Sequence, residues 1–135
     1  MNVPPPLSAF PLVSDWLAFN GDGRVDIFSG RAELGQGIST VLTQVAADEL
    51  DVVPDAIRLT QGHTGISPAE GPTVGSLSVT FGVQSVRLAA AAARALMLNH
   101  AAHFLQTKAD HLDVRDGVIL KDQVETGLSY SSLFR

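Results

Sequence analysis

The sequence predicts an α+β fold, in which a small mixed or antiparallel sheet carries two main helices, one of them long, on one face. Two observations support it: short β-prone runs lie between Gly, Asn and Asp residues, and two longer segments repeat apolar residues with a helical period. The predicted order is β, β, α, β, α, β, β. With 135 residues, 45% hydrophobic and 17% charged, the chain can bury one core, which indicates a single domain.

The N-terminal part is predicted to be an extended, proline-rich lead-in over residues 1–13, because four prolines occur before Leu12. The α+β domain then spans residues 14–135. Its first elements are two strands, residues 16–19 and 24–28, separated by Asn20, Gly21, Asp22 and Gly23. A turn of this composition between β-prone runs predicts a hairpin.

The first helix is predicted over residues 38–50. One apolar face is formed by Ile38, Leu42, Val45, Ala46 and Leu50. Ser39 and Thr40 are suitable caps for its first turn, and Pro54 prevents its continuation. A third strand follows over residues 56–61.

A long loop and a long helix come next. Residues 62–79 are rich in Gly, Ser, Thr and Pro, and a loop of this length in a compact domain is usually functional. Residues 80–106 have one uninterrupted helical pattern that would be about 40 Å long, and such a helix is expected to pack against something beyond the domain's own core. A second hairpin is predicted over 112–114 and 118–120, and residues 129–135 can start another helix.

Composition excludes several classes of function. The net charge of -5 and the pI near 5.1 argue against binding nucleic acid through a basic surface. The absence of cysteine removes disulfides, zinc–thiolate sites and iron–sulfur ligation from this chain. No run of about 18 apolar residues and no signal peptide are visible. We therefore expect no membrane span and a cytoplasmic location, with the periplasm left open.

Two glycine-containing loops each open into a predicted helix. In the first, Gly35 and Gly37 enclose Gln36, and the amides at the helix start would favour an anion or an oxo group. In the second, Gly75 precedes Ser76 and Ser78. Each loop alone is typical of ordinary helix capping, but the recurrence of the pattern favours a ligand-binding role.

The residues of both loops resemble a known family. The run ELGQGISTVLTQVAADELDV is followed by GHTGISPAEGPTVGSLSV and an alanine-rich helix. This order resembles the molybdenum-cofactor-binding large subunit of the xanthine dehydrogenase and aldehyde oxidase family, above all the isoquinoline 1-oxidoreductase and nicotinate dehydrogenase type. The resemblance extends from about Trp16 to Tyr130. One departure is His63, where the family commonly has the aspartate of a Gly-Asp-Thr run.

The resemblance implies a cofactor and its contact residues. The cofactor is molybdopterin with molybdenum, often as a cytosine dinucleotide in bacterial members. By motif, the cofactor-binding residues are Gly35, Gln36, Gly37, Gly75, Ser76 and Ser78. Gln36 is expected beside the molybdenum centre, where it hydrogen-bonds an oxo ligand, and no residue of this chain is expected to ligate the metal directly.

The resemblance also implies that this chain is an N-terminal fragment of a longer subunit. The family oxidises an aldehyde or N-heteroaromatic carbon with water as oxygen source, and its catalytic glutamate lies in a motif near the C-terminus. No such motif is present, so no catalytic residue is assigned and the isolated fragment is expected to be inactive. The implied partners are the remainder of the large subunit, a small subunit with iron–sulfur clusters, and a small-molecule substrate. The alternative is a non-catalytic module that uses the glycine loops to bind an anion or to assemble with another protein.

Overall fold

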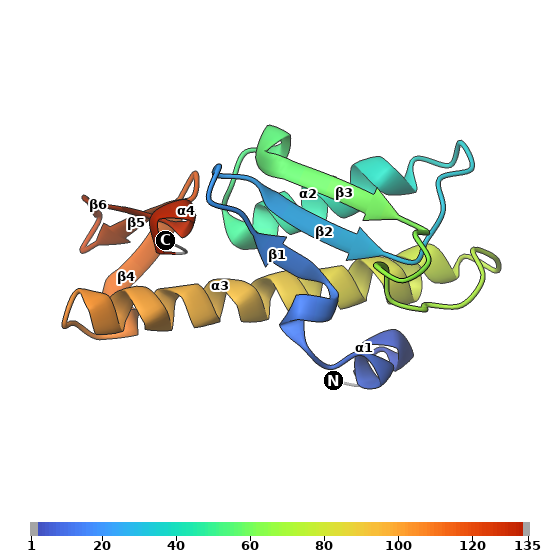
Figure 1. The fold of residues 1–135 in the computed structure, drawn as a ribbon, viewed down its shortest axis with the longest axis horizontal. Coiled ribbons are helices and arrows are strands. Elements are labelled where there is room, and N and C mark those ends of the chain that lie inside the picture. The colour runs from blue at the N-terminus through green and yellow to red at the C-terminus, as the bar shows by residue number, and fades with distance from the viewer. Residues whose placement is uncertain (1–2, 134–135) are drawn as a thin grey trace.

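The computed structural model describes residues 3–133 and confirms the α+β class (Figure 1). The helices are α1 (Pro5–Ala9), α2 (Ile38–Leu50), α3 (Gln84–Phe104) and α4 (Tyr130–Leu133). The strands are β1 (Leu17–Phe19), β2 (Val25–Ser29), β3 (Ile57–Gln61), β4 (Leu112–Arg115), β5 (Val118–Lys121) and β6 (Val124–Ser129). A π-helical turn, Ser78–Val83, leads directly into α3.

The strands form two separate three-stranded sheets, whereas a single sheet was expected from the sequence. In the first, β1 is antiparallel to β2, and β2 is parallel to β3. The parallel pair requires a crossover, which α2 provides. The second sheet, β4-β5-β6, is antiparallel throughout. The division arises because α3 carries the chain about 30 Å away before β4 begins.

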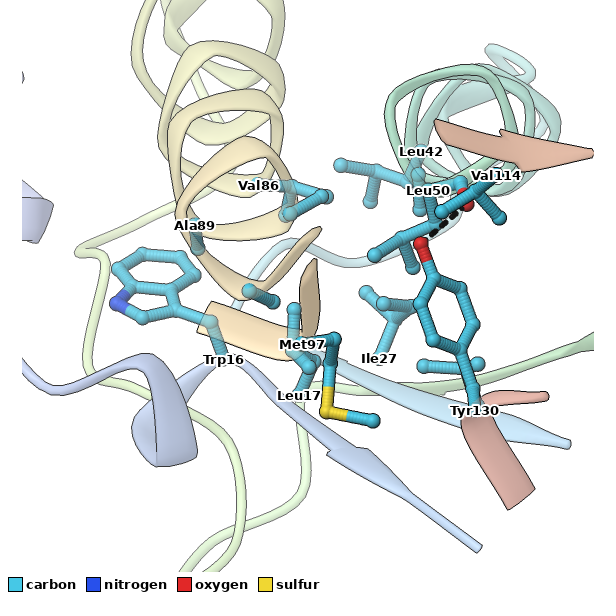
Figure 2. Close-up of a cluster of buried hydrophobic side chains, with 14 of the residues drawn as sticks. Trp16, Leu17, Ile27, Leu42, Leu50, Val86, Ala89, Met97, Val114 and Tyr130 are labelled. Carbon is cyan, nitrogen blue, oxygen red and sulfur yellow. Dashed lines mark hydrogen bonds between the residues drawn. The ribbon is translucent and has the colours of Figure 1, made fainter. Parts of the chain in front are cut away.

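The core lies between the first sheet and the two long helices (Figure 2). Val25 and Ile27 alternate with less buried residues along β2 and are almost fully buried. Leu42 of α2 and Val86 of α3 belong to the same cluster. Because burying an aliphatic side chain contributes about 1.5–3 kcal/mol, this cluster supplies the main stabilisation of the fold.

Tyr130, which directly follows β6, connects the second sheet to helix α2. Its hydroxyl donates a hydrogen bond of 2.9 Å to the Leu50 carbonyl at the end of α2. Burial raises the pKa of Tyr130 above its ordinary value, so the phenol stays protonated as a donor. The backbone of Gly117 adds a hydrogen bond of 2.8 Å to the Asp51 carbonyl. These contacts hold the C-terminal sheet against α2.

Helix α3 runs the length of the molecule and contacts elements of both halves (Figure 1). Its length therefore matches the two sheets of this chain, and the expectation that it also packs against something beyond the domain's own core stays a prediction. The segment Ser78–Phe104 also has the length and apolar composition of a membrane span, although none was expected from the sequence. Less than half of its most apolar stretch, 44%, is buried inside the fold, and one helix of this kind is weak evidence for a membrane span.

The N-terminal lead-in is not extended as predicted. Pro5–Ala9 form the short helix α1, and Val13–Asp15 form a 3-10 turn. Proline is well suited to the first helical positions because its fixed φ matches the helix and its missing N–H is not needed there. Pro6 is buried, so the proline run here begins a helix and packs against the domain.

Most other elements lie where the sequence places them. Helix α2 has the predicted bounds, and both hairpins are present. Strand β6 was not predicted, because Gly127 and its polar neighbours give a weak β signal. Helix α4 begins at Tyr130, close to the predicted start; residues 134 and 135 of that prediction lie outside the described part of the chain.

Candidate functional site

The two glycine loops lie together at one end of the molecule, opposite the β4-β5-β6 sheet (Figure 1). Packing of α2 against α3 brings the start of each helix to this end. Between them is a cleft of about 490 Å³. Its lining residues are Leu34, Gln36, Ile38, Val41, Thr73, Val74, Gly75, Ser76, Ser78 and Val79. The structure thus places Gln36, Gly75, Ser76 and Ser78 around one cleft, and none of its lining residues is charged.

The first loop is organised by the carboxylate of Glu33. Its Oε1 accepts hydrogen bonds from the amides of Gly35 (2.8 Å) and Gly37 (3.0 Å), and its Oε2 accepts one from the Ser39 amide (2.9 Å). Gly35 and Gly37 have φ values of 93° and 82°, which suit glycine. The expected capping by Ser39 and Thr40 is therefore wrong, because Glu33 fills the helix start. An external anion would have to displace it.

The amides around Glu33 also make the loop sensitive to acid. Hydrogen bonds from Ser39 and then Gly37 lower the pKa of Glu33 from 4.5 to about 2. A lowered folded-state pKa stabilises the loop fully above pH 4.5, and this stabilisation is lost as the pH falls toward 2. After division by the intrinsic exchange rate at each pH, we expect the protection of amides 35–39 to fall through this window, and Glu33→Gln to show reduced protection that does not change with pH. Hydrogen exchange read by mass spectrometry checks this; a flat wild-type profile would contradict it.

The side chain of Gln36 folds back on its own loop. Its Nε2 donates to the Ala32 carbonyl at 2.9 Å, and its Oε1 accepts from the Leu34 amide at 2.5 Å. These two contacts hold the amide group at the cleft. Because Nε2 carries two hydrogens, one remains available to a ligand.

The second loop presents unpaired donors. Gly75 and Ser76 have successive left-handed φ values of 60° and 59°, and Ser76 is not a glycine. Within the described residues, neither of their amides nor the Ser76 hydroxyl donates a hydrogen bond. Successive unpaired amides in a turn can form an anion-binding concavity. The nearest atom to a Cβ added at Gly75 would be Leu77 Cγ, at 3.9 Å, so the space beside this backbone is open.

The second loop leads into the π-helical turn that begins at Ser78. Ser78 is buried, whereas Ser76 is exposed. The Thr80 hydroxyl donates to the Ser76 carbonyl at 3.3 Å. The wider π turn was not predicted, and turns of this kind are frequent at functional sites.

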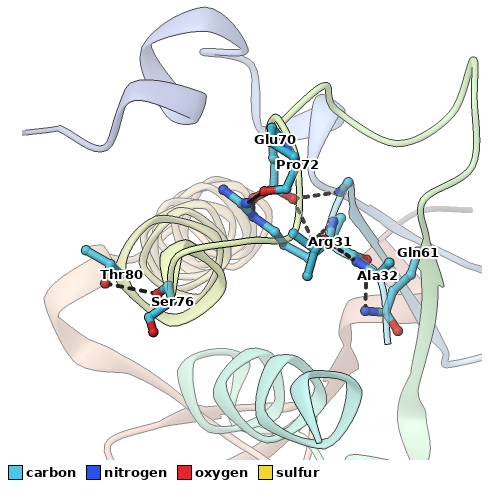
Figure 3. A network of polar contacts seen from close by, with 10 residues as sticks. Arg31, Ala32, Gln61, Glu70, Pro72, Ser76 and Thr80 are labelled. Atoms are coloured by element: carbon cyan, nitrogen blue, oxygen red, sulfur yellow. Dashed lines mark hydrogen bonds and ion pairs between the residues drawn. The ribbon is translucent and has the colours of Figure 1, made fainter. Parts of the chain in front are cut away.

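A buried polar network joins the two loops (Figure 3). Glu70 Oε2 accepts hydrogen bonds of 2.6 Å from both the Ser29 hydroxyl and the Gly30 amide. Glu70 Oε1 lies 3.5 Å from Nε of Arg31. The guanidinium of Arg31 also donates from Nη1 to the Pro72 carbonyl at 2.8 Å.

Three further hydrogen bonds extend this network, and one of them reaches α2. The Ala32 amide donates to the Thr73 hydroxyl at 3.0 Å. Gln61, at the end of β3, donates from Nε2 to the Arg31 carbonyl at 3.0 Å and accepts from the Ser39 hydroxyl at 2.5 Å. The first loop is thus held to the second loop, to β3 and to α2.

This network was not predicted from the sequence, which left Glu70 without a role. A signal was present, since Glu70 is the only Asp, Glu, Lys or Arg between Arg58 and Arg87. An isolated charge in a Gly- and Pro-rich loop can be buried only with a partner of opposite charge. Arg31, beside the other glycine loop, is that partner.

The cleft has the chemistry of a site for a polar, anionic cofactor. Its donors are an amide side chain, hydroxyls and backbone N–H groups, and its walls are aliphatic. Among residues 3–133, no three His, Cys, Asp or Glu side chains gather as metal ligands. The side chains that line the cleft offer neutral donors and apolar walls to a ligand.

Comparison with known families and proteins shows which domain this chain resembles. The family model of the molybdopterin cofactor-binding domain matches residues 7–135. One of the nicotinate dehydrogenase subunits of Pseudomonas putida is 35% identical over 118 residues, covering 87% of this chain and 10% of the relative. The beta chain of isoquinoline 1-oxidoreductase from Brevundimonas diminuta is 31% identical over 131 residues, covering 87% and 16%. The chain thus spans a small part of these relatives.

Solved structures show the same fold. Carbon monoxide dehydrogenase from Oligotropha carboxidovorans superposes with a TM-score of 0.75 at 24% identity, covering 87% of this chain and 15% of that one. Quinoline 2-oxidoreductase from Pseudomonas putida 86 gives 0.72 at 22% identity, with the same coverage.

Proposed function

The chain belongs to the molybdopterin cofactor-binding domain family, and on this basis we propose that its two glycine loops form part of the cofactor site of a molybdenum-dependent oxidoreductase. The observation that carries the proposal is the single cleft shared by Gln36 of one loop and Gly75 and Ser76 of the other. When bound, the cofactor supplies the redox chemistry. The chain supplies binding and orientation.

Each loop has a distinct task in this proposal. The Gly75 and Ser76 amides, with the Ser76 and Ser78 hydroxyls, hold the phosphorylated pterin. Gln36 offers its second amide hydrogen to the metal-bearing end of the cofactor. Gly35 and Gly37 do not line the cleft, and their positive φ values form the loop that carries Gln36. Neutral donors bind the cofactor without a competing fixed charge.

The activity of the whole protein is an extension of this proposal. We infer oxidation of an aldehyde or N-heteroaromatic carbon with water as oxygen source, because the relatives include a nicotinate dehydrogenase and an isoquinoline oxidoreductase. The remainder of the large subunit and a small subunit with iron–sulfur clusters complete the complex. We propose a cytosine dinucleotide form of the cofactor and a cytoplasmic location.

The alternative of a simple anion-binding module is less well supported. At the start of α2, where the sequence places an anion, the amides of residues 35, 37 and 39 already bind Glu33. The second loop has unpaired amides at Gly75 and Ser76, and it faces a cleft larger than a small anion requires. A cofactor fits this space better.

Cofactor analysis tests the proposal. The full-length subunit containing this segment, co-expressed with its neighbouring subunits, is expected to purify with molybdenum and pterin at near one per subunit. Elemental analysis and pterin fluorescence after oxidation measure both. A complex that contains neither would refute the proposed function.

Gln36→Ala in that complex is expected to lower turnover by about 10- to 100-fold while cofactor content is kept, because one positioned donor is lost and the loop backbone remains. Gln44→Ala is the matched control, since Gln44 is exposed on the helix that follows the loop and lies outside the cleft. Steady-state kinetics with each variant make the comparison. Equal turnover in the two variants would remove Gln36 from the site.

A further inference from the structure

We propose that Arg31 and Glu70 are positioning residues that set the spacing of the two cofactor loops, an inference that rests on the proposed function. Together with Ser29 and the Pro72 carbonyl they form a unit that we call the loop clamp. Neither charged side chain lines the cleft. The clamp therefore acts through the loops it joins.

The first argument is the bridging pattern of the contacts. Glu70, from the second loop, binds Ser29 and Gly30 at the root of the first. Arg31, from the first loop, reaches across to the Pro72 carbonyl in the second. Each loop thus contributes one charged side chain that ends on the other loop. Thr73, which lines the cleft, accepts a hydrogen bond from the Ala32 amide beside Arg31.

The second argument is burial. The side chains of Arg31 and Glu70 are 1% and 0% exposed, so water cannot replace either partner. Removing one charge leaves the other buried and uncompensated, which is strongly destabilising. A buried pair that must stay together fixes the distance between the segments that carry it.

The third argument is the space left around the clamp. A Cβ at Gly82, in the π-helical turn, would lie 2.9 Å from Arg31 Cγ and 3.1 Å from Glu70 Oε1. The turn that starts at Ser78 therefore packs its backbone directly on the ion pair. The clamp sets the position of this turn as well as the separation of the loops.

The test uses the full-length subunit in its complex. The double variant Arg31→Met/Glu70→Gln removes both charges but leaves an amide oxygen for Ser29 and Gly30, so it is expected to fold. We expect residues 71–77 to exchange amide hydrogens faster than in the wild type. We also expect molybdopterin to be lost about 10-fold faster on dialysis, because the loss of residues that support metal ligands typically weakens metal binding by at least this factor. Arg31→Lys, which keeps the charge but lacks the guanidinium fork, should show the same two changes.

The matched control is a second Arg–carboxylate pair, Arg58 with Asp26, which joins strands β2 and β3 and is more exposed. Asp26→Asn/Arg58→Met should leave both readouts at wild-type values. If the clamp variants exchange amides and lose molybdopterin at the wild-type rates, the inference about the loop clamp is wrong, whereas the proposed function is unaffected. If the wild-type complex holds no molybdopterin, the proposed function fails, while exchange of residues 71–77 still decides whether the clamp orders the loop.

Discussion

Replacing Gly30 by alanine is expected to destabilise the chain by about 1–3 kcal/mol. The added Cβ would lie 2.3 Å from the Pro68 carbonyl oxygen and 3.1 Å from the Glu70 amide. Both atoms belong to the backbone, so relief requires one loop to move away from the other. The same movement would lengthen the 2.6 Å hydrogen bond between the Gly30 amide and Glu70. Urea denaturation followed by the fluorescence of Trp16 measures the loss.

Gly21→Ala is the control for this substitution. A Cβ at Gly21 meets nothing within 4 Å, and its backbone does not need a glycine. The control should stay within about 0.5 kcal/mol of wild type. Equal midpoints for Gly30→Ala and Gly21→Ala would show that the two loops do not approach each other this closely.

Local signals in the sequence were sufficient for the elements that depend on local physics. Helix α2 has the predicted bounds because its apolar spacing and Pro54 both act within a few residues. The two glycine loops were found for the same reason. Their meeting at one cleft follows from the packing of α2 against α3, which the sequence order only suggested.

The features that could not be predicted depend mainly on contacts between distant residues. Arg31 and Glu70 are far apart in the chain, and no periodicity connects them. The role of Glu33 was missed although it is local, because a carboxylate reaching forward to three amides leaves no pattern in residue type. The division into two sheets was missed because strand pairing depends on the position at which the chain leaves α3 and begins β4. The cofactor assignment came from the resemblance, and the roles of Gln36 and the serines remain predictions.

Replacing Trp16 by alanine is expected to have the largest effect on stability, about 3–5 kcal/mol. Trp16 is 1% exposed and belongs to the core cluster. Its indole N–H donates to the Phe10 carbonyl at 2.8 Å, which ties the segment after α1 to the domain. Alanine removes the apolar volume and this hydrogen bond together. Because domains are stable by only about 5–15 kcal/mol, the variant should be close to unfolding.

Two further variants separate the contributions of apolar volume and of the hydrogen bond to the stability that Trp16→Ala loses. Trp16→Phe keeps most of the ring and loses the donor, so it should cost less than alanine; the hydrogen-bond part alone is about 1 kcal/mol. Leu96→Ala removes a large apolar side chain that is 58% exposed, and should stay within about 0.5 kcal/mol of wild type. Urea denaturation followed by far-ultraviolet circular dichroism measures all three, since two of them lack the tryptophan. If Trp16→Ala were no less stable than Leu96→Ala, the N-terminal segment would not be packed on the core. If Trp16→Phe lost as much stability as Trp16→Ala, the effect would be assigned to the hydrogen bond.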